Sequence, residues 1–401
     1  MPVLPGAAGE LRFERIQRSD SDMTVLKKNS VKVYDRFEHE TEEQILNGVL
    51  KAGDCILSEH EIAAHYRISR RSARTAIDHL IDKGLVVRRA GIGTFVAALK
   101  PGTQSRCAKY SASVILPDIS DVFLMTVCEG IQQAAHEFNC HLTFKSSHGD
   151  IDFENRNILF SLQRQDDGVI IFPNYGRGNL ESLLKLKEAG IPFVLLDRRF
   201  PDLETNYVGV DNVTGGYLAC EHLIRTGCRR IVHLYGTSGS ANDERLAGYR
   251  RALSDYGIPG SEKSIRRFSD LGPSHTHGSV RFEPDMESGY RNMQYFLSLE
   301  ERPDGVFAGN DYQALGALRA IREAGLKIPD QISVVGFDEL KINPYLEQPL
   351  TTIRQPQAEL GYQALKLLIG EISGQSKSVG SSVIRLQVQL VQGKTTRVPG
   401  K

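Results

Sequence analysis

The 401-residue sequence contains no tryptophan, carries no net charge and has no long hydrophobic run. Its 49 Lys and Arg residues balance 49 Asp and Glu residues, so any surface that attracts polyanions must be local. No apolar stretch approaches the ~18 residues that cross a bilayer, and residues 1–10 lack the basic and apolar parts of a signal peptide. We therefore expect a cytoplasmic protein without a membrane partner.

Cysteine is scarce as well, with six residues and no Cys-x-x-Cys motif. In a chain of this length, this excludes a disulfide-built scaffold and indicates buried thiols. The hydrophobic share of 40% is ordinary and excludes wholesale disorder.

Motifs that carry a metal or a cofactor are missing too. His60 and His65 resemble a zinc-protease signature, but their spacing of five residues turns the second ring about 140° away from the first. Gly91-x-Gly93 lacks the third glycine and the following helix of a dinucleotide fingerprint, and there is no phosphate-binding P-loop. We expect no metal site and no cofactor.

At about 100 to 200 residues per domain, the sequence is long enough for two or three folded units. Its composition changes along the chain and indicates where these units begin and end. We predict a tail of uncertain order, a small domain of helices and a hairpin, a linker, and a large α/β domain. In order, these regions are residues 1–33, 34–98, 99–110 and 111–397.

The large region alternates short β-branched runs with helix-length amphipathic stretches, which is typical of βαβ units and a parallel sheet. Nearly 290 residues are too many for one compact open sheet, so we expect two similar lobes. The Gly- and Ser-rich stretch 260–278 is predicted to be a surface loop. The predicted strands are Ser113–Leu116, Gly168–Phe172, Phe193–Leu196, Ile231–Tyr235, Gly305–Ala308 and Ile332–Phe337.

The small region concentrates positive charge. Between residues 67 and 100 there are eight Lys and Arg residues and only two Asp residues, a net charge of eight minus two, or plus six, within a neutral chain. A solvated basic face is the simplest interpretation of such a run. The order of the local signals around it favours a second interpretation.

Two short helices are predicted here. Ser58 and Glu61 have the spacing of a capping box, so a helix should begin at Glu59 and end near Tyr66. Ser69 can cap a second helix. The predicted buried positions of that helix recur at i, i+3, i+4 and i+7 and are Ala73, Ala76, Ile77 and Leu80. Arg70, Arg71 and Arg74 then lie on its exposed side, as in a helix-turn-helix that enters a major groove.

A hairpin should follow, because the β-prone runs 85–89 and 94–96 flank a turn with two glycines. The whole segment resembles the winged helix-turn-helix of GntR-type bacterial regulators at Ser69-Arg70-x-Ser72-x-Arg74 and Arg89-x-Gly91-x-Gly93-Thr94. The residues thereby predicted to bind DNA are Ser69, Arg70, Arg71, Ser72, Arg74, Arg89, Gly91, Gly93 and Thr94.

Polar residues follow several predicted strands of the large region. In open α/β sheets, ligands bind outside the carboxyl ends of the strands, so these residues should converge on one crevice. Carboxylates, amides, guanidinium groups and aromatic rings together suit a neutral polyhydroxylated ligand. The residues are Asp118, Asn174, Asp197, Arg198, Asn310, Asp311 and Asp338.

This region also resembles the LacI-type sensor domain, which is similar to periplasmic sugar-binding proteins. The resemblance lies in Asn310-Asp311-x-x-Ala314-x-Gly316, in the run from Ile332 to Asp338, and in Thr351-Thr352-Ile353-Arg354-Gln355-Pro356. It implies chain crossings between lobes near Gly209, Ile353 and Val383. The sugar contacts that it implies are Asp118, Phe123, Asn174, Asp197, Arg198, Arg245, Phe282, Asn310, Asp338 and Gln355.

The predicted fold is thus an N-terminal winged helix-turn-helix followed by a two-lobed α/β domain that resembles periplasmic binding proteins. The combination resembles the arabinose repressors of bacilli, which implies a homodimeric repressor that binds double-stranded operator DNA and a sugar effector. A pentose such as L-arabinose is the first candidate. Two alternatives remain open: a sugar-processing enzyme in which Asp197 and Asp338 act as acid and base, and a sensor region that only dimerises.

Overall fold

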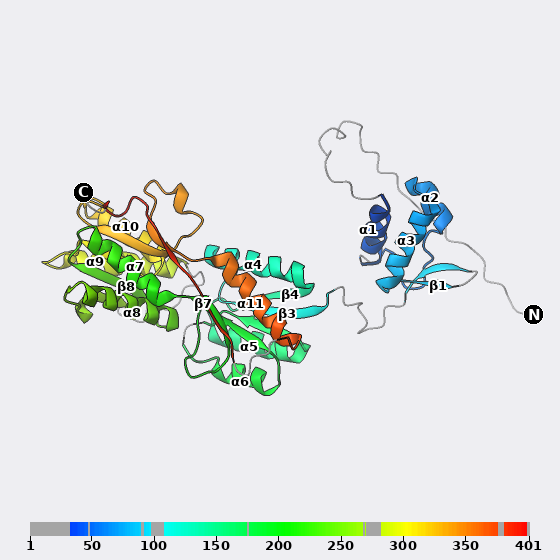
Figure 1. The fold of residues 1–401 in the computed structure, drawn as a ribbon, viewed down its shortest axis with the longest axis horizontal. Coiled ribbons are helices and arrows are strands. Elements are labelled where there is room, and N and C mark those ends of the chain that lie inside the picture. Colours follow the sequence, from blue (N-terminus) through cyan, green and yellow to red (C-terminus); the bar gives the residue numbers. More distant parts are fainter. Residues whose placement is uncertain are drawn as a thin grey trace, which may run out of the picture. The chain divides into compact units, whose positions relative to one another are not determined.

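The computed structural model describes residues 33–46, 49–89, 92–97, 108–174, 176–267, 269, 282–375 and 381–398. The chain divides into two compact units, Met1–Cys107 and Ala108–Lys401 (Figure 1). Residues 1–32 of the predicted tail and residues 99–107 of the predicted linker lie outside the description. No helix of the described ranges is long and apolar enough to cross a membrane.

The first unit holds three helices and a two-stranded hairpin. They are α1 (Val33–Leu46), α2 (Glu59–Tyr66), α3 (Arg70–Asp82), β1 (Val86–Arg89) and β2 (Gly93–Val96). The predicted starts of α2 and α3 and the hairpin are confirmed. The predicted stripe of α3 is buried, with each of its four side chains at most 1% exposed. It packs against Phe37 of α1, Ile62 of α2 and Val86 of the hairpin.

The second unit consists of two α/β lobes, which confirms the predicted architecture. The sheet of the first lobe is entirely parallel, in the order β13-β7-β6-β5-β3-β4. Its strands are β3 (Tyr110–Leu116), β4 (Cys140–Ser146), β5 (Gly168–Ile171), β6 (Phe193–Leu196), β7 (Asn206–Val210) and β13 (Val383–Leu386). The helices α4 (Val122–Phe138), α5 (Ile151–Arg164), α6 (Leu180–Glu188) and α11 (Gln357–Ile372) belong to it.

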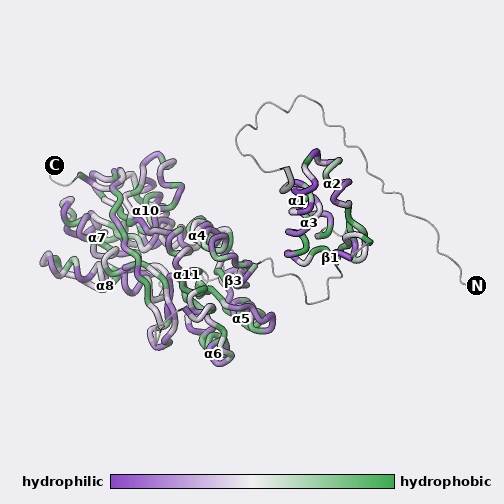
Figure 2. The backbone as a smooth tube through the Cα atoms, turned by 45° about the vertical axis from the view of Figure 1, so that its right-hand side comes forward, coloured by the Kyte–Doolittle hydropathy of each residue, from purple (hydrophilic) through white to green (hydrophobic). Residues whose placement is uncertain are grey.

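The sheet of the second lobe has the order β14-β12-β11-β10-β8-β9, and only β14 in it runs antiparallel to its neighbour. Its strands are β8 (Ile231–Gly236), β9 (Ile265–Arg267), β10 (Gly305–Ala308), β11 (Ser333–Asp338), β12 (Thr351–Arg354) and β14 (Gln389–Val391). The helices α7 (Asn212–Arg225), α8 (Ser240–Asp255), α9 (Phe282–Ser298) and α10 (Asp311–Glu323) pack on it. Hydrophilic and hydrophobic stretches alternate along α7, α8 and α10, as expected for helices with one buried face (Figure 2).

One prediction about this lobe is wrong in part. Residues 265–267 fall in the stretch predicted to be a surface loop, but they form β9, in which Ile265 pairs with His233 of β8. Ile265 is only 4% exposed because it packs in the hydrophobic core, and β9 covers what would otherwise be an open edge of the sheet at β8. Residues 268 and 270–278 of the predicted loop lie outside the description.

The chain passes between the lobes three times. The crossings lie between β7 and α7, between β12 and α11, and between β13 and β14. Each lobe is therefore built from distant parts of the sequence, and three short connections join them (Figure 1). Such connections permit one lobe to rotate against the other as a hinge.

Candidate functional site

The first candidate site is the start of α3 with the hairpin beside it. Ser58 and Glu61 form the predicted capping box of α2: the Ser58 amide donates to the Glu61 carboxylate at 2.8 Å. Arg67 ends α2 in the left-handed conformation, with φ of 53°. Ser69 then caps α3 by accepting from the Ser72 amide at 3.1 Å. This tight turn leaves Arg70, Arg71 and Arg74 on the exposed side of the first turns of α3.

The side chain of Arg70 is oriented by the preceding helix. Its Nη2 atom lies 2.9 Å from Nδ1 of His60 and donates to that ring nitrogen, because a guanidinium has no acceptor. Both side chains are exposed. The contact joins α2 to the exposed first turn of α3.

The hairpin holds its cations in different ways. The Arg89 guanidinium stacks 5.0 Å from the centroid of the Phe95 ring. Arg88 instead pairs with Glu59 and Asp78, at 3.2 Å each, so its charge is satisfied within the unit. Of the other predicted DNA contacts, Gly93 has φ of 144° and Thr94 is 8% exposed, while Gly91 lies outside the described residues.

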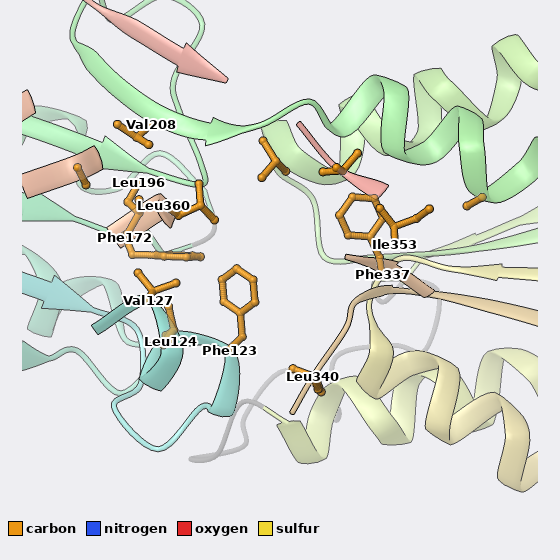
Figure 3. Close-up of a cluster of buried hydrophobic side chains, with 14 of the residues drawn as sticks. Phe123, Leu124, Val127, Phe172, Leu196, Val208, Phe337, Leu340, Ile353 and Leu360 are labelled. Atoms are coloured by element: carbon orange, nitrogen blue, oxygen red, sulfur yellow. The ribbon is translucent and has the colours of Figure 1, made fainter. Parts of the chain in front are cut away.

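The second candidate site is a cleft between the two lobes, at the carboxyl ends of β5, β6, β10 and β11. Its cavity volume is about 40 Å³, so in this arrangement of the lobes the cleft is narrow and its own side chains nearly fill it. Phe123 projects from α4 toward the same gap, opposite Phe337 and Leu340 of the second lobe (Figure 3). The residues that line the cleft are Asp121, Phe123, Phe172, Asp197, Arg198, Ala241, Asn242, Arg245, Asp285, Asn310, Tyr312, Asp338 and Gln355.

Most of the predicted ligand residues are brought together in this cleft. They are Phe123, Asp197, Arg198, Arg245, Asn310, Asp338 and Gln355. The side chain of Phe282, at the start of α9, lies outside the description.

Three residues that were expected to converge on this crevice do not line it: Asp118, Asn174 and Asp311. Asp118 accepts from the amide and the hydroxyl of Ser120 at 2.9 and 2.8 Å. The Asn174 amide donates to Glu154 at 2.7 Å, and its side-chain nitrogen donates to Ser147 at 2.9 Å. Asp118 and Asn174 stabilise the loops that follow β3 and β5.

Six cleft residues were not predicted from the sequence. They are Asp121, Phe172, Ala241, Asn242, Asp285 and Tyr312. Asp121 had a readable signal, because it caps α4 by accepting from the Phe123 and Leu124 amides at 2.8 and 3.2 Å. Phe172 is the last residue of a predicted strand. Asp285 follows no strand and reaches the cleft only because α9 packs beside Asn310. Its carboxylate accepts from the side-chain nitrogen of Asn310 at 2.8 Å.

Two aspartates of the cleft have unusual backbone conformations. Asp197 has a φ of 64° and Asp338 has a φ of 128°. Residues other than glycine rarely adopt such positive φ angles. Strain of this kind persists where the surrounding structure over-determines it and is frequent at binding sites. Here it directs both carboxylates at the ends of β6 and β11.

Two buried acceptor atoms belong to residues that line the cleft. Gln355 donates through Nε2 to Asp338 at 2.6 Å. Within the described part of the chain, Asp197 Oδ1 and Gln355 Oε1 are buried and have no hydrogen-bond partner. A buried acceptor without a donor costs about 1–3 kcal/mol, which a ligand that brings hydroxyl donors can recover.

Burial is the largest influence on the pKa of two aspartates, Asp338 of the cleft and its neighbour Asp311. It raises the pKa of the Asp338 carboxyl well above its usual value, while the positive charge of Arg245 acts in the opposite direction. Burial also raises the pKa of Asp311, which accepts from Thr352 at 2.6 Å and from the Leu340 amide at 3.0 Å. A network of hydrogen bonds thus fixes the end of β11.

Arg245 is held rigidly. Its Nε donates to Asn212 at 2.8 Å, its Nη1 donates to the Gly309 carbonyl at 2.6 Å, and its guanidinium lies 3.7 Å from the Phe337 ring centroid. α8 can approach α7 this closely because residue 216 of α7 is a glycine. A Cβ atom there would lie 2.1 Å from the Arg245 carbonyl oxygen. Only glycine fits at that crossing.

Two family models match the sequence. The model of the gntR family of bacterial regulatory proteins matches residues 33–96, and that of the periplasmic binding protein-like domain matches residues 220–396.

Similar solved structures support the fold. A LacI family transcriptional regulator from Enterococcus faecium with bound ribose matches at a TM-score of 0.60 and 28% identity, over 73% of this chain and 100% of that chain. The complex of the transcriptional regulator CelR with cellobiose matches at a TM-score of 0.62 and 22% identity, over 92% of this chain, and shows the fold alone.

Curated relatives cover most of the chain. The arabinose metabolism transcriptional repressor of Halalkalibacterium halodurans is 28% identical over 349 residues, 86% of this chain and 90% of that protein. The ribose operon repressor of Haemophilus influenzae is 30% identical over 328 residues, 79% of this chain and 93% of that protein. The HTH-type transcriptional repressor CytR of Escherichia coli is 30% identical over 71% of this chain and 79% of that protein. The chain therefore belongs to the family of bacterial transcriptional repressors that includes the ribose operon repressor and CytR, with a gntR-type DNA-binding domain in front of a periplasmic-binding-protein-like sensor domain.

Proposed function

We propose that the first unit binds operator DNA and that a neutral sugar in the interlobe cleft releases the repressor from it. The observation that carries this proposal is the convergence of Asp197, Asp338 and Gln355 on the cleft, with two acceptor atoms that lack donors in the described structure. A sugar supplies hydroxyl donors in fixed positions, and Phe123 offers an apolar ring surface.

The proposal assigns DNA binding to the predicted residues of α3 and the wing. The exposed Arg70, Arg71 and Arg74 at the N-terminal turns of α3 suit base edges and phosphates in a major groove. The hairpin would place Arg89 and the backbone near Gly93 beside the flanking phosphates. Operator binding of this kind should weaken steeply as the salt concentration rises.

Further parts of the proposal follow from this activity. We assign a homodimer, because a two-fold operator requires two reading helices at a fixed spacing. Sugar can change operator affinity only if it shifts that spacing, through closure of the lobes. Since the chain would act on chromosomal DNA, the proposal places it in the cytoplasm. On this account it is not an enzyme.

A pentose is the first effector to test. L-arabinose is suggested by the arabinose repressors among the relatives, and D-ribose by the ribose operon repressor and the ribose-bound regulator.

The test combines gel shifts with calorimetry. Full-length protein is titrated on a palindromic fragment of the promoter beside its own gene, with and without L-arabinose, D-ribose, D-xylose or D-glucose. The proposal predicts a salt-sensitive shift that one pentose reverses. Shifts that are absent or indifferent to every sugar would contradict it, and conversion of any sugar to product would favour the enzyme alternative.

A further inference from the structure

Glu244 of α8 lies between two guanidinium groups that come from the other lobe. Its Oε1 atom is 3.1 Å from Nη2 of Arg199 and 3.2 Å from Nη2 of Arg385. Arg199 follows β6 and Arg385 lies within β13, and both strands belong to the sheet of the first lobe. Glu244, Arg199 and Arg385, called the interlobe triad below, therefore join the lobes by charge.

The backbone reinforces the triad. The amide of Arg199 donates to the hydroxyl of Ser240 at 3.0 Å, one turn before Glu244 on α8. Arg199 thus holds the first turns of α8 through both its main chain and its side chain. The Glu244 side chain is only 17% exposed, so water and salt screen it less than an ordinary surface pair.

The triad is linked to the cleft through its neighbours in sequence. Arg198 lines the cleft beside Arg199, and Arg245 lines it beside Glu244. Each dipeptide therefore gives one residue to the cleft and one to the triad. If α8 moved away from the end of β6, the triad would break and the two arginines of the cleft would separate.

A second ion pair between the lobes, Lys341 with Glu129, is far more exposed than the interlobe triad. Lys341 Nζ lies 2.7 Å from Glu129 Oε2, but these side chains are 56% and 60% exposed. An exposed pair of this kind contributes about 0–1 kcal/mol. Neither residue nor its sequence neighbours line the cleft. This pair is a matched control for the removal of an interlobe charge.

We propose that Glu244 is a positioning residue for the effector site: through the interlobe triad it holds the lobes in the arrangement that binds effector, and so sets effector affinity without contacting the effector. The inference rests on the proposed function for the nature of the effector. The arrangement of the lobes can be tested separately from it.

The test uses full-length Glu244→Gln, with Glu129→Gln as the control. Calorimetry with L-arabinose, or with D-ribose if L-arabinose does not bind the wild type, should show an about tenfold higher Kd for Glu244→Gln. The Kd of Glu129→Gln should stay within twofold. The melting temperature without sugar should stay similar in both variants, which separates positioning from a general loss of stability.

Hydrogen exchange of the sugar-free proteins tests the same inference without an effector. The amide of Arg199 and the first turns of α8 should exchange at least fivefold faster in Glu244→Gln and at the wild-type rate in Glu129→Gln. Should Glu244→Gln fail to fold, Arg385→Gln removes one arm of the triad and is measured instead, with the same expectations.

The outcomes separate the two proposals. A wild type that binds none of the sugars contradicts the proposed effector, and the exchange data then decide the inference alone. Sugar binding with a Kd within twofold of wild type in Glu244→Gln, or exchange at Arg199 that is unchanged, would overturn the role of Glu244.

Discussion

The two units present opposite kinds of candidate site. The candidate DNA-binding site is cationic, and its exposed residues Arg70, Arg71, Arg74 and Arg89 come from two short stretches of sequence. The interlobe cleft is buried and rich in carboxylates, and its residues are spread from Asp121 to Gln355. A surface that meets a long polyanion needs accessible charge, whereas a pocket for a small neutral ligand needs directed acceptors shielded from water. The difference indicates that each site can be changed without disturbing the other.

The largest expected effect is on the cleft alone. Asp338→Ala removes a carboxylate at the end of β11 and leaves the Gln355 Nε2 donor without its acceptor. Loss of a buried hydrogen-bonding group costs about 1–3 kcal/mol, so effector Kd should rise by about 5- to 150-fold while operator affinity is kept. Calorimetry and gel shifts measure the two. Asp255→Ala, at the end of α8 and away from the cleft, should bind effector normally. An affinity within fivefold of wild type in Asp338→Ala would break the assignment of the cleft.

The opposite pattern is expected when a cation is removed from α3, the helix proposed to enter the major groove. Arg70→Ala should weaken operator binding by about 10- to 100-fold, or about 1–3 kcal/mol, and leave effector Kd unchanged. Gel shifts at constant salt concentration test this. Arg319→Ala removes another exposed charge, from α10 of the other unit, and should have no effect on the shift. If the two variants behaved alike, the contrast between the units would be lost.

The packing that holds Arg245 in the cleft can be tested by stability. Gly216→Ala places a methyl group 2.1 Å from the Arg245 carbonyl oxygen, which should destabilise the second unit by about 1–3 kcal/mol. Gly370→Ala in α11 meets no atom within 4 Å and should stabilise it by about 0.5–1 kcal/mol. Urea unfolding followed by circular dichroism compares the two. Equal effects would show that the α7–α8 crossing does not need its glycine.

A smaller effect concerns the pH dependence of stability, and it comes from Glu154, which does not line the cleft. Burial raises the pKa of Glu154, which anchors Asn174, from its ordinary 4.5 to about 6. The folded protein therefore keeps a proton that the unfolded chain has released, so stability falls as pH rises from about 4.5 to 6. A shift of about 1.5 units corresponds to about 2 kcal/mol.

Glu154→Gln cannot ionise and should lose this part of the pH dependence. The difference in unfolding free energy between variant and wild type, measured by urea unfolding from pH 4.5 to 7, isolates it from other titrating groups. Parallel profiles for the two proteins would contradict the raised pKa. Effector affinity of the variant should change little, because Glu154 does not line the cleft.

Local signals made the first unit predictable. The start of α2 at Glu59 depends on Ser58 and Glu61, and the start of α3 at Arg70 depends on Ser69, so each signal lies within two residues of the start that it sets. Such caps and the helical periodicity act over one or two turns, so the sequence contains them in readable form. The exposed arginines of α3 follow from the buried stripe on its other side.

From the strand pattern alone, the cleft was predictable only where a strand directs a side chain; Phe123, Arg245 and Gln355 were predicted from the family resemblance. Asp197, Asn310 and Asp338 follow predicted strands and do line it. Asn174 also follows a strand, yet it turns toward Ser147 and Glu154, which a linear pattern does not reveal. Asp285 reaches the cleft because α9 packs beside α10, and β13 forms by pairing with β7 over 170 residues away. Contacts at such separations leave little local trace.

The central claim is that sugar and operator oppose each other on one protein. Calorimetry should titrate the effector pentose into full-length protein, first alone and then saturated with the operator duplex. The account predicts an effector Kd about tenfold higher in the presence of operator, a coupling of about 1.4 kcal/mol. The same Kd in both titrations would contradict it.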